Sequence, residues 1–483
     1  MALTDTLADY FGFAEHGTDL RTEVVAGLTT FLTMSYIVVV NPSILAVAIV
    51  NGPGPDIGAS MAEVQQMIAV VTLISAAVAT LIMALYANRP FGQAPGLGLN
   101  AFFAFTVVLG LGIPWNTALA AVVVEGLIFI LLTAVGAREY IIRVFPEPVK
   151  FAVGGGIGLF LAVIGLDAMR VIASDPATYI QFSPVFAQDP VAIVGVVGLL
   201  FTFALYARGV PGSIIIGILG TTALGGVLSA LGYAAYPAGE LDVTLASASL
   251  GPALDSLTYS AAGYDISPLV GAFLGGFANV DAFGFALIVF TFFFVDFFDT
   301  AGTLTGVSQI AGFLDEDGNL PDIDKPLMAD AIGTTVGGML GTSTVTTYIE
   351  SASGVEEGGR TGMTALVVGV LFLLALAVVP LAAAIPQYAS HIALVVIAVV
   401  MLRNLVDIDW SDMTVAIPAG ITVIAMPFTY SIAYGIAAGI ISFPVVKAAT
   451  GRVDETRPGH WVLAAAFVLY FFVRTGGVLS AAV

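Results

Sequence analysis

The stretch FGFALIVFTFFFVDFFDTAGTLTGV, residues 283–307, decides how the rest of the chain is interpreted. It is long and apolar enough to cross a bilayer as a helix, yet Asp296 and Asp299 lie within its run of Phe and Val. A charged side chain at the bilayer centre costs about 3 kcal/mol on insertion scales, so such residues are usually functional. Because the two aspartates are three positions apart, they lie on roughly the same helix face. We interpret them as part of a binding site. The alternative is a structural network satisfied by nearby Thr and Ser.

Two further stretches break the pattern of apolar spans. GTSTVTTYIESASG, residues 341–354, is rich in Ser, Thr and Gly and carries Glu350, and PFGQAPGLGLNAFFAFTVVLG, residues 90–110, is broken by Pro and Gly before Asn100. Non-helical backbone at membrane depth is tolerated only where protein or a cavity covers it. The two segments are about 250 residues apart, in corresponding halves of the chain. Such a pair indicates a transporter site built on an inverted repeat.

The composition indicates an integral membrane protein. Of 483 residues, 58% are hydrophobic and only 10% are charged, whereas a soluble domain carries about 25% charged residues. Repeated apolar segments of membrane length predict an all-α polytopic protein rather than a barrel. The N-terminal residues lack the basic start and apolar core of a cleavable signal. The chain has no Cys, so neither disulfides nor thiolate chemistry are expected.

The net charge of −20 lies almost wholly on the connecting segments. A high-salt habitat is the favoured explanation, and repulsion of acidic partners is the alternative. Nucleic-acid binding is excluded because the chain has no basic patch that would meet phosphates.

Basic residues predict the topology and the division of the chain. If Arg21 and Arg89 are cytoplasmic, most other Lys and Arg residues fall on the same side, with Arg170 and Arg474 as exceptions. We therefore expect a multi-pass protein of the cell membrane with a cytoplasmic N-terminus. The predicted parts are a cytoplasmic segment (1–20), a first repeat (21–232), an outer loop (233–282), a second repeat (283–450) and a C-terminal segment (451–483) whose apolar piece either spans or lies in the interface.

Other polar features have plainer explanations. The acidic loop LDEDGNLPDIDKP, residues 314–326, has Pro326 where a calcium loop needs its bidentate Glu, so no metal site is predicted. His391 is expected to be an interfacial or packing residue. Glu125, alone in an apolar span, is a weaker candidate for a second buried acid with a role in transport.

Five motifs together resemble a known family. These are AGLTTFLTMSYIVVVNP (26–42), NRPFGQAPGLGLNAFF (88–103), FVDFFDTAGTLTGV (294–307), DKPLMADAIGTTVGG (324–338) and GTSTVTTYIESASGVEEGGRTGMTALVVG (341–369). They resemble the AzgA-like purine permeases, a branch of the nucleobase/ascorbate transporter superfamily. The resemblance implies about fourteen spans in two inverted seven-span repeats, core and gate domains, and short strands in spans three and ten. It also implies proton symport of hypoxanthine, guanine or adenine without a cofactor, and a possible homodimer.

The resemblance also assigns roles to individual residues. Asn100, Asp296 and Glu350 match the family's purine-binding positions, and Asp299 matches a position needed for transport. Carboxylates accept hydrogen bonds from ring N–H groups, and an Asn amide offers both a donor and an acceptor.

Two further assignments rest on physical chemistry. Phe102, Phe103 or Tyr348 are candidates to stack on the base. We expect Asp299 to carry the coupling proton, because burial disfavours the charged form of a carboxyl group.

Alternative functions remain open at this stage. Transport of another nucleobase, uracil or xanthine, would need the same kind of site. An anion transporter of this architecture would place a basic residue or free helix N-termini at the broken spans, where the sequence places acids. An intramembrane protease would need its two aspartates on separate spans, so we do not expect an enzyme.

Overall fold

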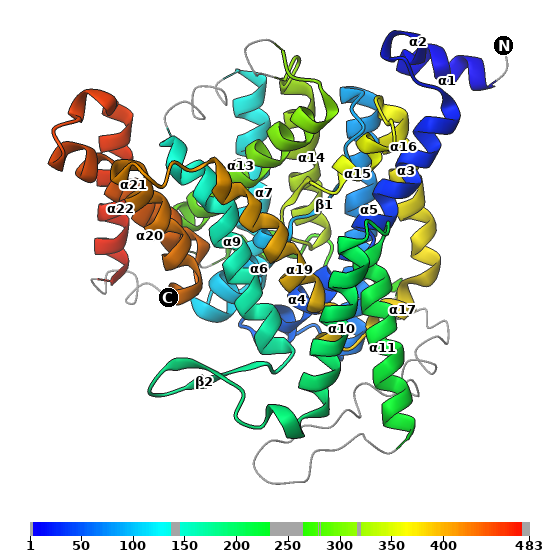
Figure 1. Cartoon of the computed structure of the whole chain (residues 1–483), viewed down its shortest axis with the longest axis horizontal. Coiled ribbons are helices and arrows are strands. Elements are labelled where there is room, and N and C mark those ends of the chain that lie inside the picture. The colour runs from blue at the N-terminus through cyan, green and yellow to red at the C-terminus, as the bar shows by residue number, and fades with distance from the viewer. Residues whose placement is uncertain are drawn as a thin grey trace.

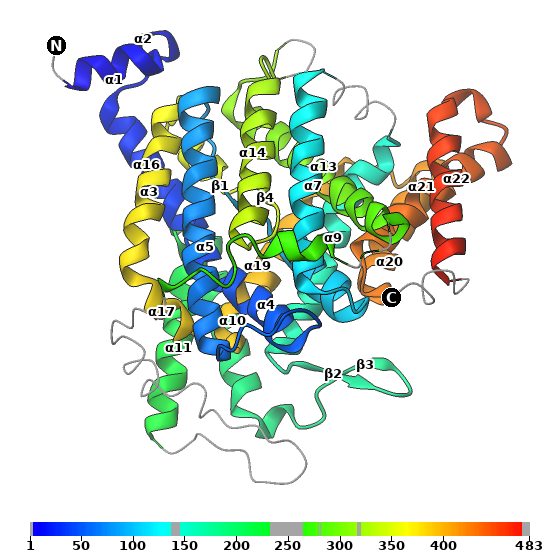
Figure 2. The ribbon, with the colours of Figure 1, turned by 180° about the vertical axis from the view of Figure 1, so that it is seen from behind.

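The computed structural model describes residues 3–136, 145–231, 264–278, 280, 282–315 and 320–475. Within these ranges the chain is almost entirely helical, and most of the long helices run roughly parallel to one another (Figure 1, Figure 2).

The first half contains α1 (Leu3–Phe11), α2 (Phe13–His16), α3 (Leu20–Met34), α4 (Ile37–Asn51), α5 (Met61–Ile82), the π-helical η1 (Met83–Ala87), strand β1 (Gln93–Pro95), α6 (Leu97–Ala101), the π-helical η2 (Phe102–Gly110), α7 (Trp115–Ala134), α9 (Glu147–Ala168), strands β2 (Ile172–Asp175) and β3 (Tyr179–Phe182), η3 (Phe186–Gln188), α10 (Pro190–Ala207) and α11 (Ser213–Ala230). The second half contains η6 (Ala272–Phe277), α13 (Ala282–Ala311), α14 (Asp324–Leu340), strand β4 (Val345–Thr347), α15 (Ser351–Glu356), α16 (Gly362–Ala375), η7 (Leu376–Val378), α17 (Val379–Ala383), α18 (Gln387–Ser390), α19 (Ile392–Met401), η8 (Leu402–Asp407), α20 (Met413–Thr429), α21 (Ile432–Ala449), η9 (Val453–Glu455) and α22 (Pro458–Thr475).

The predicted membrane fold is confirmed. Ten helices of the described chain are long and apolar enough to cross a membrane. The remaining four of the fourteen predicted spans correspond to α14, α20 and the two interrupted segments, β1–α6–η2 and β4–α15. In each half, the third spanning unit is the one that begins as a strand and continues as a helix.

Local sequence signals set several helix starts. Ser60 and Glu63 form a reciprocal capping box at the start of α5, in which the Ser60 N–H donates to Glu63 Oε2 at 2.8 Å. Asp412 caps α20 by accepting from the Thr414 N–H at 2.8 Å. Hydrogen bonds from the Thr414 and Arg452 side chains hold the pKa of the Asp412 carboxyl at about 2.

The two halves meet in a short antiparallel sheet. Strand β1 pairs with β4 so that Gln93 faces Thr347 and Pro95 faces Val345. The Gly96 N–H donates to Thr344 O, and the Tyr348 N–H donates to Gly92 O, both at 3.0 Å. These bonds satisfy the backbone groups that each broken span leaves without helical partners.

Helix packing separates a core from a gate. In the core, α5 packs against α4, α14 and α16, and α7 packs against α14 (Figure 2). In the gate, α9 packs against α19 and α20, and α20 packs against α21, while α22 packs on the outer side of α21 (Figure 1).

The N-terminal segment packs against the rest of the protein. It forms α1 and α2, and Phe11 and Phe13 are buried against Met363 of α16. Most of the predicted outer loop (233–263) and part of the acidic loop (316–319) lie outside the described residues, as do residues 137–144 between α7 and α9.

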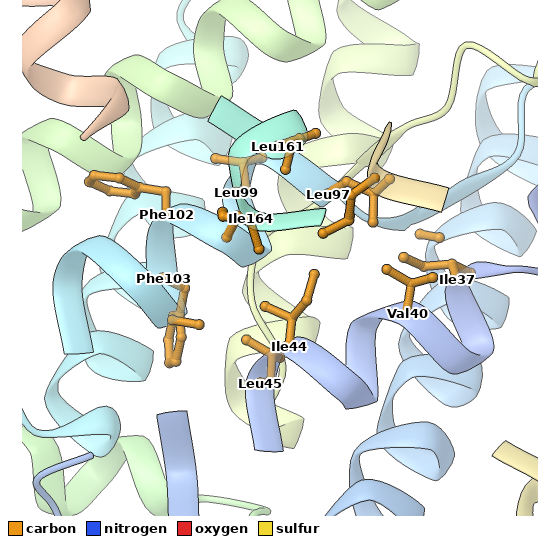
Figure 3. Packing of buried hydrophobic residues seen from close by; sticks show 14 of the residues in the cluster. Ile37, Val40, Ile44, Leu45, Leu97, Leu99, Phe102, Phe103, Leu161 and Ile164 are labelled. Atoms are coloured by element: carbon orange, nitrogen blue, oxygen red, sulfur yellow. The ribbon is translucent and has the colours of Figure 1, made fainter. Parts of the chain in front are cut away.

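Apolar packing fixes the interrupted third span between core and gate. Leu97 and Leu99 of α6 and Phe102 of η2 lie among apolar side chains from α4 and α9 (Figure 3). Apolar side chains of α4 in the core and of α9 in the gate therefore pack against the helical segment that follows β1.

Candidate functional site

A cavity of about 160 Å³ lies where the strand pair meets the gate. Its core side is formed by the turn from β1 into α6, by α13, and by the segment from β4 to α15, and its gate side by α9, α19 and η8. Its charged groups are two carboxylates, Asp299 and Glu350, and one ammonium, Lys150. The cavity therefore lies at the junction of the two repeats, where a transporter of this class binds its substrate.

Glu350 is held by a residue from the first span. The Tyr36 hydroxyl donates to Glu350 Oε1 at 2.5 Å, and Tyr36 itself is almost completely buried. Tyr36 lies in the turn between α3 and α4, where the backbone keeps helical dihedral angles, and its phenol lines the cavity. A carboxylate has several acceptor positions on its two oxygens, so Glu350 can accept from a ligand in addition to the Tyr36 hydroxyl.

Tyr348 forms the adjacent wall. Its hydroxyl donates to Pro95 O at 2.5 Å, which joins β4 to the end of β1. Its ring centroid lies 6.4 Å from that of Tyr36, with the planes at 45°. The two phenols enclose the cavity near Glu350, and each already donates its hydroxyl proton to a protein acceptor.

Asp299 and Asp296 have different surroundings although both lie on α13. Asp299 lines the cavity and is partly exposed to it. Its Oδ2 lies close to the turn after β1, 3.4 Å from the position that a Cβ at Gly96 would take, while the same Cβ would lie 2.8 Å from Thr346 Cγ2 of β4. Asp296 is fully buried behind the cavity, where its Oδ1 lies 3.1 Å from Thr300 Oγ1.

Asn100 is also placed behind the cavity wall. It is fully buried, its Nδ2 donates to Pro95 O at 3.4 Å, and its Oδ1 accepts from the Ser343 hydroxyl. These bonds connect the start of α6 to the segment before β4.

Phe102 and Phe103 point into the apolar core. Their rings pack on Phe292 of α13, with centroids 5.0 Å and 6.2 Å away. Of the seven residues predicted from the sequence, the structure thus brings Asp299, Tyr348 and Glu350 to the cavity. It places Asn100, Asp296, Phe102 and Phe103 in the protein around it.

A buried aspartate that sequence reasoning did not single out holds the strand pair. Asp330 Oδ1 accepts from the Thr347 N–H at 2.9 Å and from Gln93 Nε2 at 3.3 Å. Its Oδ2 accepts from Thr300 Oγ1 at 3.0 Å. Asp330 thereby ties both strands to α13. The sequence clue was an acid inside the apolar span of residues 324–340.

Three cavity residues were also missed. They are Tyr36 in the first span, Lys150 at the start of α9 and Asn404 in η8, and the sequence around each resembles an ordinary apolar span or a span end. Within the described ranges, no group of three or more His, Asp or Glu side chains is arranged to hold a metal ion.

Comparison with known proteins identifies the family. The sequence model described as "Permease family" matches residues 21–438. The adenine permease AdeP of Escherichia coli (strain K12) is 38% identical over 95% of this chain and 94% of its own length. The guanine/hypoxanthine permease PbuG of Bacillus subtilis (strain 168) is 38% identical over 96% of this chain and 98% of its own length.

Among solved structures, the transmembrane domain of the cyanobacterial bicarbonate transporter BicA matches with a TM-score of 0.54. The match covers 87% of this chain and 97% of that one at 16% identity, so the likeness concerns the fold alone. Because the family match and both permease relatives cover most of the sequence, the resemblance seen in the motifs is confirmed, and the chain belongs to the Permease family.

Proposed function

We propose that this protein is a proton-coupled symporter that takes up purine nucleobases, namely hypoxanthine, guanine or adenine. The observation that carries the proposal is the small cavity between core and gate that contains Asp299 and Glu350. The adenine and guanine/hypoxanthine permeases among its relatives support the choice of substrate.

Glu350 is the proposed acceptor for the base. A purine presents ring N–H groups in one plane, and Glu350, which accepts from the Tyr36 hydroxyl, has further acceptor positions for such an N–H. The Tyr348 ring forms a wall against which the flat base can pack. A ligand without the matching N–H would leave a desolvated carboxylate unpaired, and this mismatch gives specificity. The other predicted residues then act by shaping the wall behind the site; these are Asn100, Asp296, Phe102 and Phe103.

Asp299 is the proposed proton carrier. With both acids ionised, Asp299 and Glu350 give the cavity one negative charge more than Lys150 can balance. A single proton on Asp299 makes the three groups electrically neutral, which lowers the cost of moving the site across the membrane. Protonation thus favours one of the two conformational states in which the site faces one side of the membrane or the other. The proton is the coupling ion, and the proposed mechanism uses no cofactor.

The protein crosses the cell membrane many times, with its N-terminus on the cytoplasmic side. Its proposed parts are the cytoplasmic segment (1–20), the first repeat (21–232), the outer loop (233–282), the second repeat (283–450) and the C-terminal segment (451–483). Two copies form a homodimer, which light scattering of the purified protein would detect as twice the chain mass.

A competition experiment tests the function. Uptake of labelled hypoxanthine by cells that express the protein is measured against unlabelled hypoxanthine, guanine, adenine, xanthine, uracil and ascorbate. Glu350→Gln should weaken purine binding about tenfold or more, because loss of one hydrogen bond to a charged group costs about 1.5 to 3 kcal/mol.

The control is Glu356→Gln, six positions away on the exposed end of α15. Uptake inhibited by uracil or ascorbate but by no purine would refute the proposal, as would unchanged affinity in Glu350→Gln.

A further inference from the structure

Lys150 is the one cation among the residues that line the described cavity. It lies near the start of α9, on the gate side, opposite the acids of the core. Within the described chain, its ammonium makes no hydrogen bond and no ion pair within 4 Å, although the charges of Glu147 and Arg457 act on it. Its side chain is only partly buried. Lys150 also lines the neighbouring cavity of about 550 Å³, together with Glu147 and Arg457, so its flexible side chain lies at the boundary between the two cavities and can reach a ligand in the smaller one by a change of rotamer.

The other strong donors of the cavity are already used. The Tyr36 hydroxyl donates to Glu350, and the Tyr348 hydroxyl donates to Pro95 O. Asn404 of η8 lies beside Lys150 on the gate side, since a Cβ added at Gly154, one turn after Lys150, would lie 2.1 Å from the Asn404 amide nitrogen. The gate thus offers donors, and the core offers acceptors.

We propose that Lys150 determines substrate specificity by donating to the carbonyl edge of a 6-oxopurine. This inference rests on the proposed function. Hypoxanthine and guanine carry an N1–H donor beside two acceptors, O6 and N7, whereas adenine carries an amino donor in place of O6. A lysine ammonium can donate but cannot accept, so it matches O6 and leaves the adenine amino group unpaired. Glu350 accepts from the N–H edge of the base, and Lys150 donates to its carbonyl edge. The bound base then contacts both the core and the gate.

The test compares substrates within each variant. In Lys150→Met, the inhibition constants of hypoxanthine and guanine should rise about tenfold or more, and that of adenine by less than about threefold. Lys150→Arg, which keeps the charge and the donors, should retain the preference for oxopurines. The control is Lys325→Met, because the Lys325 ammonium lies at the surface 3.2 Å from Asp322 Oδ2 and Lys325 does not line the substrate cavity.

Equal weakening of all purines in Lys150→Met, or no change, would overturn the assignment, because a structural role cannot alter the ratio between substrates. If Lys150→Met does not fold, the wild-type protein still decides the question. 6-Thiopurine in its thione form keeps the N1–H donor but has sulfur, a poor acceptor, in place of O6, so it should inhibit hypoxanthine uptake about tenfold more weakly than hypoxanthine itself, and equal inhibition contradicts the proposal. Failure of every purine to compete in the wild type would refute the proposed function instead.

Discussion

At the residue scale, buried polar groups of the site are bonded to segments far away in the chain. Tyr36 reaches Glu350 across more than 300 positions, and Asp330 connects Thr347 of β4 with Gln93 of β1. A buried polar group stabilises the fold only while its partners remain, because an unmatched donor in the interior costs about 1 to 3 kcal/mol. Such side chains therefore fix the geometry of the cavity as well as the stability of the protein.

Asp330→Ala should destabilise the protein. The change leaves the Thr347 N–H, the Gln93 amide and the Thr300 hydroxyl without their shared acceptor, so we expect the free energy of unfolding to fall by about 3 kcal/mol or more. Thermal unfolding in detergent measures the effect.

The control is Lys325→Ala, which removes the exposed ion pair with Asp322 and should change stability by at most about 1 kcal/mol. Equal melting temperatures for the two variants would show that Asp330 does not hold the strand pair.

At the element scale, the contact between α6 and α9 joins core to gate. A Cβ added at Gly98 would lie 2.7 Å from Ile157 Cγ2, so only glycine lets the two helices approach this closely. The backbone of Gly98 is not in the left-handed region, so alanine is excluded by the neighbouring side chain rather than by its own conformation. The close approach of α6 to α9 therefore depends on the pair Gly98 and Ile157.

Gly98→Ala should slow transport. Overpacking of this kind costs about 1 to 3 kcal/mol in the state in which the two helices touch, so the initial uptake rate should fall several-fold or more. The double variant Gly98→Ala, Ile157→Ala removes the clash and should recover part of that rate.

Gly420→Ala is the control, since the nearest atom to its added Cβ is 3.8 Å away. An unchanged rate in Gly98→Ala, or no recovery in the double variant, would argue against a functional contact here.

The sequence predicts the elements better than the directions of their side chains. Span lengths and the two interrupted segments follow from hydropathy and from the Pro, Gly and Ser content, because the bilayer imposes the length of each helix. The directions of Phe102 and Phe103 do not follow, because η2 is π-helical and its side chains do not keep the α-helical spacing. Lys150 has the sequence pattern of a basic anchor at a membrane surface, and only the packing of α9 against η8 brings it to the cavity.

At the scale of the whole molecule, two repeats of opposite orientation meet in the strand pair β1–β4, and the cavity lies beside it. The cavity lies between core and gate. In the proposed mechanism, movement of one domain past the other therefore exposes the site to each side of the membrane in turn. Coupling then requires that the proton and the base favour the same conformational state.

Accumulation of labelled hypoxanthine in proteoliposomes under an imposed pH gradient, acidic outside, tests the central claim most directly. The wild-type protein should concentrate the base above its external level only while the gradient lasts, with proton entry reported by an internal pH dye. Asp299→Asn should abolish this accumulation while it preserves purine binding and exchange. Accumulation by the wild type without a gradient, or gradient-driven accumulation by Asp299→Asn with unchanged proton entry, would contradict the account.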